Sequence, residues 1–86
     1  MPVLSKFYGI VIRMFVAPSL RARFHAIYGN SELVVGIAPL AILNGDAPPR
    51  VRNMVLEWAA EHQEELLEAY NRCRRAEQPM TIEPLL

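Results

Sequence analysis

The feature that most constrains the fold is a long amphipathic segment in the second half of the chain. From Arg50 to about Ala76 the apolar residues recur with the period of an α-helix. One side of that helix collects Val51, Val55, Trp58, Ala59, His62, Leu66, Ala69 and Cys73. Asp46 is the expected N-cap, and Pro48 and Pro49 fall in the first turn, where a missing N–H is harmless. Such a helix needs a second layer to cover its apolar side.

The first half of the chain provides that layer as alternating, β-prone segments. The predicted strands cover residues 7–16, 21–28 and 32–37, with a short fourth strand at 40–43. The first of them is apolar on both faces, which is typical of a strand inside a sheet or at a dimer contact, and Pro18 is expected to end it. Turns are expected at Gly29-Asn30 and Asn44-Gly45, since glycine tolerates the positive φ that tight turns need.

These patterns predict an α+β fold, with a three- to four-stranded antiparallel sheet packed against one long C-terminal helix. The 86 residues are expected to form a single domain, with the sheet over 1–45, the helix over 46–76 and an irregular tail over 77–86. Hydrophobic residues make up 52% of the chain, which excludes disorder and favours an oligomer, because a small core cannot bury them all. The expected core contains Ile10, Ile12, Phe24, Val35, Val55, Trp58 and Leu66.

The predicted location is the cytoplasm. Cys73 is the sole cysteine, so no intramolecular disulfide can form, and this fits a reducing compartment. Arg13 interrupts the apolar run near the N-terminus, which argues against a signal peptide. The sequence also lacks the run of about 20 apolar residues that a membrane span requires.

Charge is distributed unevenly although the net charge is zero. Residues 1–31 contain no acidic side chain, and their basic residues are Lys6, Arg13, Arg21 and Arg23. Residues 53–71 contain no Lys or Arg, and their acidic residues are Glu57, Glu61, Glu64, Glu65 and Glu68. The first half is therefore suited to face an anion and the helix to face a cation. Dispersed basic residues remain a weak signal for nucleic-acid binding, which usually needs a dense basic patch.

His25 is the one candidate for catalysis, with Arg21 and Arg23 beside it on the polar side of the second strand. A histidine next to two arginines is suited to acid/base cleavage of RNA, with the guanidinium groups on the phosphate. The same residues also describe a solvated strand face. The sequence favours this second interpretation, because no second acid/base group lies nearby, and we expect no nuclease activity.

The remaining polar residues favour structural roles or partner binding. His62 is expected to be a core residue whose ring bonds to backbone or to a tyrosine hydroxyl, and Cys73 to be a buried, inert thiol. With His25, these residues lack the short spacings of a zinc site, so neither a metal nor a cofactor is expected. A solvated helix face or a partner surface is expected for the glutamate stripe Glu57, Glu61, Glu64 and Glu68.

Several motifs resemble those of DUF4160, a family of short prokaryotic proteins of unknown function. The helix carries the most specific match, Val55-Leu56-Glu57-Trp58-Ala59 followed by His62 and Glu65-Leu66-Leu67. The N-terminal match consists of Met1, Pro2, Phe7, Gly9, Ile10, Ile12 and Met14, and the tail match of Ile82-Glu83-Pro84-Leu85. The resemblance spans nearly the whole chain.

The chain departs from the family pattern in a histidine-rich segment. Only Phe24-His25-Ala26 of that segment is present, and Ser19 and Arg23 stand where the pattern has histidines. A family site built on those histidines would be lost here, or its partner specificity changed. Family members are often encoded beside a second small protein in an arrangement that resembles toxin–antitoxin pairs, which implies a partner-binding or regulatory role.

Three functions follow as hypotheses. The first is a small cytoplasmic protein-interaction module, antitoxin-like or accessory in such a pair, whose partner is a neighbour-encoded protein or a second copy of the chain. The second is an RNA-directed toxin or nuclease that uses His25 with Arg21 and Arg23. The third is a nucleic-acid-binding regulator without catalysis. A highly basic neighbour-encoded protein would favour the first hypothesis, and an acidic one the second.

Overall fold

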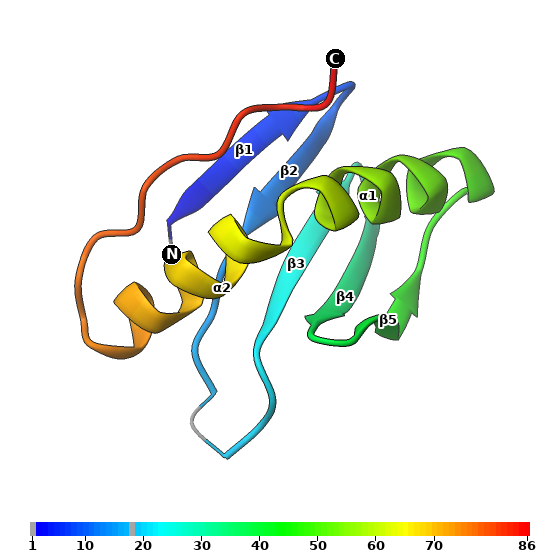
Figure 1. The fold of residues 1–86 in the computed structure, drawn as a ribbon. Helices are drawn as coiled ribbons and strands as arrows, with labels where there is room; N and C mark the ends of the chain where they lie inside the picture. The colour runs from blue at the N-terminus through cyan, green and yellow to red at the C-terminus, as the bar shows by residue number, and fades with distance from the viewer. Residues whose placement is uncertain (1, 18) are drawn as a thin grey trace.

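The computed structural model describes residues 2–17 and 19–86, which form a five-stranded sheet followed by two helices (Figure 1). The elements are β1 (Val3–Phe7), β2 (Ile10–Arg13), β3 (Arg23–Tyr28), β4 (Ser31–Ile37), β5 (Leu40–Asp46), α1 (Pro49–Glu61) and α2 (Gln63–Arg74). The strands pair antiparallel in the order in which they follow one another along the chain. The α+β class is therefore confirmed. The predicted strand number and the single long helix need correction.

The apolar run 7–16, predicted as one strand, contains the turn of a hairpin between β1 and β2, and only Ile10–Arg13 within it form a full strand. Its turn is Tyr8-Gly9, where φ is 49° and 81°. Gly9 adopts this left-handed conformation without the steric cost that a side chain would add. The preceding residues therefore form β1, a strand that the pattern missed, and Tyr8 is 55% exposed rather than buried. Pro18, expected to end the strand, lies outside the described residues.

The predicted turn at Asn44-Gly45 is also wrong, because β5 continues through it to Asp46. Gly45 has a φ of 86° and pairs with Leu33 close to a bulge at Leu43, and a Cβ there would overlap the backbone carbonyl of Glu32. Asp46 is not the helix N-cap. Its side chain accepts a hydrogen bond from the next backbone N–H (2.9 Å), while Pro48 occupies the N-cap position.

The long helix is interrupted at His62, which ends α1 and precedes α2. His62 has a φ of −119° and a ψ of 25°, outside the helical range, and its N–H is shared between the carbonyls of Trp58 and Ala59. Beyond the break, the side chain of Gln63 donates a hydrogen bond to the carbonyl of Ile37 in β4 (2.6 Å). The bend lets both helices follow a twisted sheet that a straight helix would leave.

Both helices cover the same face of the sheet, and the core lies between these two layers (Figure 1). All seven residues predicted for the core are completely buried. Trp58 lies at its centre, with its ring centroid 5.4 Å from that of Phe7 and 5.9 Å from that of Phe24. Its indole N–H donates to the carbonyl of Glu83 (2.8 Å). Neither helix in the described part of the chain has the length and apolar character needed to cross a membrane.

The tail 77–86 has no regular secondary structure, but it packs against the domain. The N–H of Ile82 donates to the carbonyl of Leu4 in β1 (2.8 Å), and the Ile82 side chain is buried. The tail thus runs along the outer edge of β1, as Figure 1 shows, and covers part of a strand edge that would otherwise present unpaired backbone groups.

Trp58→Ala is expected to lower the free energy of unfolding by about 3–5 kcal/mol, because it removes the largest buried side chain and leaves a cavity. Urea unfolding followed by far-UV circular dichroism measures the loss. Leu20→Ala is the matched control, since Leu20 is 52% exposed and its truncation should change stability by less than about 0.5 kcal/mol. Equal stability of the Trp58 variant and the wild type would contradict the two-layer packing.

Candidate functional site

The face of the sheet opposite the helices is the candidate functional site. Strand alternation and register place on it Lys6, Val11, Arg13, Arg23, His25, Ile27, Glu32, Val34 and Gly36. Their neighbours along each strand point into the core. We call this surface the open face, because among the described residues neither helix packs on it (Figure 1). It combines half-exposed aliphatic side chains with basic ones.

His25 lies near the middle of the open face and is held on two sides. Its Nδ1 is 2.7 Å from Oε2 of Glu32, a residue two positions beyond its direct cross-strand partner Val34. The ring of Phe15 packs on the imidazole with a centroid distance of 4.2 Å. His25 is consequently only 18% exposed, and its orientation is fixed by the carboxylate and the aromatic ring. The expectation that no second acid/base group lies near His25 is therefore wrong.

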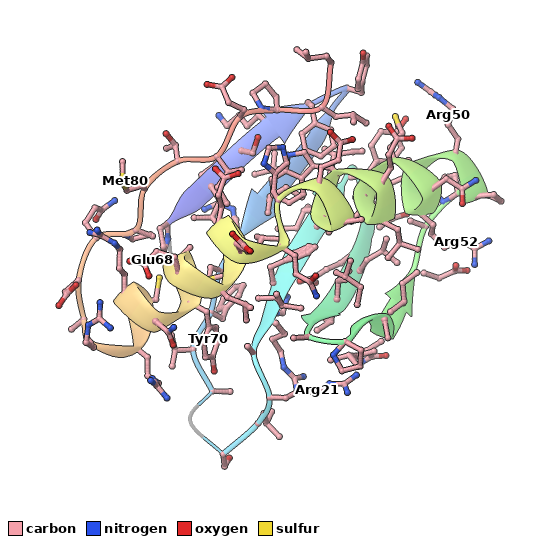
Figure 2. The ribbon with its side chains drawn as sticks, viewed as in Figure 1. Arg21, Arg50, Arg52, Glu68, Tyr70 and Met80 are labelled. Atoms are coloured by element: carbon pink, nitrogen blue, oxygen red, sulfur yellow. The ribbon has the colours of Figure 1, made fainter. Side chains whose placement is uncertain are left out.

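Arg23 is the first residue of β3, at one end of the open face, and Arg21 lies just before it, as Figure 2 shows for Arg21. The guanidinium of Arg21 rests on Gly36 of β4, and the Nε–H of Arg23 donates to the carbonyl of Arg21 (3.2 Å). Among the described residues, no carboxylate oxygen lies within 4.0 Å of either guanidinium. The three residues singled out in the sequence, Arg21, Arg23 and His25, are thus brought to one surface.

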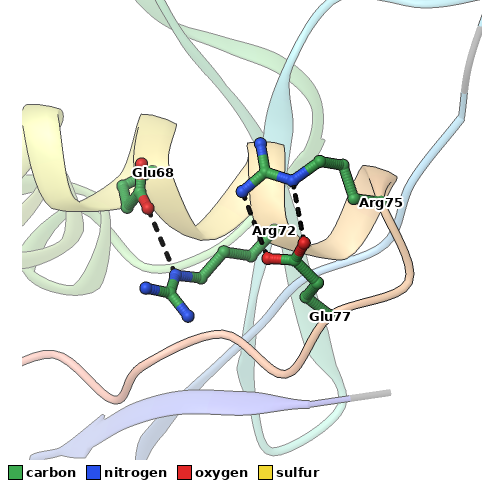
Figure 3. A network of polar contacts seen from close by, with 4 residues as sticks. All are labelled: Glu68, Arg72, Arg75 and Glu77. Carbon is green, nitrogen blue, oxygen red and sulfur yellow. Dashed lines mark hydrogen bonds and ion pairs between the residues drawn. The ribbon is translucent and has the colours of Figure 1, made fainter.

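The predicted glutamate stripe lies away from the open face, on the solvent side of the helices. Its members Glu57, Glu61, Glu64 and Glu68 are all exposed. Glu68 forms an i,i+4 ion pair with Arg72, whose Nε is 3.2 Å from the Glu68 carboxylate (Figure 3). Farther along, Arg75 donates two hydrogen bonds to Glu77, and this bonding lowers the pKa of the Glu77 carboxyl. The chain therefore has a basic sheet face and an acidic helix face.

His62 is half-buried at the helix break and has a different partner from the one predicted. Its Nδ1 is 2.6 Å from Oε1 of Glu65, one turn along the chain, and its ring packs against Trp58 with a centroid distance of 5.5 Å. His62 lies on the helix layer and His25 on the opposite face of the sheet, so the two histidines do not form one site. The described residues contain no cluster of three or more His, Cys, Asp or Glu side chains that could hold a metal ion.

Two members of the open face, Glu32 and Gly36, were missed by the sequence interpretation. A hairpin turn at Gly29-Asn30 pairs Tyr28 with Ser31 and so sets the register of both strands. That register puts residue 32 diagonally beside residue 25 on the same face, within reach of long side chains. The signal was therefore present in the predicted hairpin, but it appears only when the strands are paired residue by residue.

The fold and this surface define a small two-layer α+β domain, in which a meandering sheet carries two helices on one face and a basic surface on the other. The family profile of DUF4160, a domain of unknown function, matches residues 9–71. The chain belongs to this family. No curated protein and no solved structure matches it.

Cys73 is expected to be a slow nucleophile, because partial burial raises the pKa of its thiol and so lowers its thiolate fraction near neutral pH. The rate of alkylation by iodoacetamide, measured against pH, should give a higher apparent pKa for the native chain than for the same chain in urea. A native midpoint at or below the unfolded one would contradict this assignment.

Proposed function

We propose that this chain is a protein-interaction module that binds an acidic segment of another protein on its open face. The observation that carries the proposal is the pair of arginines, Arg21 and Arg23, which have no carboxylate partner among the described residues and lie on the same surface as exposed aliphatic groups. The neighbour-encoded protein of a toxin–antitoxin-type pair is the first partner to test.

Electrostatics support an anionic partner. Two guanidinium groups close together on a sheet repel one another, and a carboxylate placed between them would replace that repulsion with charge-assisted hydrogen bonds. The other charged residues do not supply this carboxylate, since Glu32 bonds to His25 and the helix glutamates lie on the opposite side of the domain. A partner is therefore suited to provide it.

The apolar part of the open face supports a protein rather than a nucleic acid. Val11, Ile27 and Val34 are half-exposed beside the basic residues, and interfaces between proteins combine apolar side chains with arginine. A nucleic-acid surface needs a denser positive charge and aromatic rings on which bases stack. Here Phe15 is covered by His25, and the nine basic residues of the chain are balanced by nine acidic ones.

The proposal is tested by NMR titration of the isotope-labelled chain with a short peptide rich in glutamate and leucine. We expect the largest shifts at amides of β2, β3 and β4, because these strands form the open face. A peptide with lysine in place of glutamate and a single-stranded RNA are the comparison ligands. Tighter binding of the RNA, or peptide shifts confined to the helices, would contradict the proposal.

Charge reversal sharpens this test. Arg21→Glu combined with Arg23→Glu should weaken binding of the acidic peptide, and of the neighbour-encoded protein, by at least about tenfold. Arg74→Glu combined with Arg75→Glu, at the end of α2, imposes the same change in net charge away from the open face and is the matched control. Equal weakening of peptide binding by both pairs of substitutions would mean that binding depends only on net charge. That result would contradict a binding site on the open face.

RNA cleavage is the second candidate function, and the bond between His25 and Glu32 is the observation in its favour. Cleavage needs one group to take the proton of the 2′-hydroxyl and another to protonate the leaving oxygen. Because His25 and Glu32 bond to one another, they supply one proton-transfer unit. The register also pairs Asp46 of β5 with Glu32, but the Asp46 carboxylate accepts a hydrogen bond from the backbone N–H of Ala47 and is not bonded to His25.

We therefore expect no cleavage when the purified chain is incubated with mixed RNA. The wild type is compared with His25→Ala and with Glu32→Gln, which preserves the shape of Glu32 while removing its charge. Cleavage by the wild type that disappears in both variants would make the chain a nuclease and identify the pair as its catalytic unit.

A further inference from the structure

Gly36 is the last residue but one of β4, where glycine has no conformational reason to be present. Its φ is not among the positive values found at Gly9, Gly29 and Gly45, so any residue could adopt this backbone. Glycine weakens a strand, because it adds conformational freedom to the unfolded chain and contributes no side chain to the sheet. Gly36 is also buried although it belongs to the open face. Its lack of a side chain therefore calls for a different explanation.

The space above Gly36 is filled by Arg21. A Cβ on Gly36 would lie 3.2 Å from both Nε and one terminal nitrogen of Arg21, and 3.4 Å from the central carbon of the guanidinium. Two nitrogens of this group lie slightly closer than its central carbon, so the guanidinium occupies the space where a side chain at residue 36 would stand.

Arg23 adjoins the same position. It is the direct cross-strand partner of Gly36, and its Nε–H is bonded to the carbonyl of Arg21. Arg23 is thus held by a hydrogen bond to backbone, and Arg21 lies over Gly36. Neither arginine pairs with a carboxylate among the described residues. A guanidinium that is already positioned loses less conformational freedom when it binds a ligand, and its fork geometry matches two oxygens of one oxyanion.

We propose that the space left by the missing side chain of Gly36 positions the guanidinium of Arg21, with Arg23 beside it, to bind a single oxyanion. We call this space the Gly36 seat. The inference rests on the proposed function, and the anion it assigns there is a side-chain carboxylate of the acidic segment. A phosphate group has the same oxyanion chemistry, so inorganic phosphate and acetate are the two small probes that distinguish the sources. Gly36 acts through Arg21 and is a positioning residue.

The experiment compares Gly36→Ala and Gly36→Val with the wild type. The added side chains meet the Arg21 side chain rather than backbone, so the fold should remain intact, and thermal unfolding checks this. The guanidinium should be lifted slightly by alanine and displaced by valine. We expect the affinity for the acidic peptide to fall from the wild type to Gly36→Ala and again to Gly36→Val. The loss for Gly36→Val should be about tenfold, comparable to the loss for Arg21→Ala.

A double-mutant cycle separates the seat from a general effect on the strand. On the Arg21→Ala background, Gly36→Val should cause no further loss, because no guanidinium remains to be displaced. Arg21→Lys should also bind weakly, since an ammonium lacks the planar fork. A further loss of peptide affinity on the Arg21→Ala background would contradict the role of Gly36 in positioning Arg21. Unchanged peptide binding by Gly36→Val would contradict it too, and either result would leave the proposed function intact.

The Nε–H signal of Arg21, observed by NMR, gives a reading that does not depend on a protein partner. In the wild type, acetate should shift this signal more than inorganic phosphate does. The shift caused by acetate should be smaller in Gly36→Val than in the wild type. Such a shift together with no binding of the acidic peptide would support the seat while refuting the proposed function. A stronger response to phosphate than to acetate would overturn the carboxylate assignment, and no response to either anion would overturn the receptor.

Discussion

The packing of Trp58 is the interaction on which the rest of the structure depends. Its ring contacts Phe7 from β1 and Phe24 from β3, so one helix residue joins strands at both sides of β2. Its indole N–H holds the tail at Glu83, and its ring supports His62 at the helix break. A domain of this length buries a modest fraction of its surface, and a single large side chain that joins every layer therefore contributes a large share of its stability.

The two-layer packing also determines where function can reside. Once the helices have covered one face of the meander, the other face stays available, and strand alternation assigns every second residue of β2, β3 and β4 to it. The same hairpin register that buries Phe24 and Val35 therefore brings His25 beside Glu32. Core formation and site formation are consequences of one pairing pattern.

The sequence predicted the layers and the core well, because both follow from periodicity. Trp58 and Leu66 recur at helical spacing, Phe24 and Val35 alternate along strands, and all are fully buried. The errors fall where a local backbone choice overrides periodicity. The turn at Tyr8-Gly9 falls within a run that is apolar on both faces, so the pattern gave no sign of an interruption. The break at His62 likewise lies beside a long-range contact, the hydrogen bond of Gln63 to Ile37 in β4, which no helical period encodes.

The candidate site was predicted in part for a similar reason. Arg21, Arg23 and His25 are close in the sequence, so their proximity needed no knowledge of the fold. Glu32 and Gly36 join them only through the pairing of β3 with β4, and the significance of Gly36 lies in a missing side chain that becomes visible when the guanidinium above it is located. Amino-acid composition alone cannot reveal that a missing side chain leaves space for a guanidinium.

The opposed basic and acidic faces have a consequence for how a partner approaches. The net charge of the chain is zero, so at separations greater than the Debye length, about 8 Å at physiological ionic strength, it exerts little net attraction or repulsion. At shorter range the separated charges form a dipole directed across the sheet, from the helix glutamates towards Arg21 and Arg23. A charged partner that arrives by diffusion is then rotated before contact is made. The charge pattern thus acts on orientation during the encounter rather than on the frequency of collision.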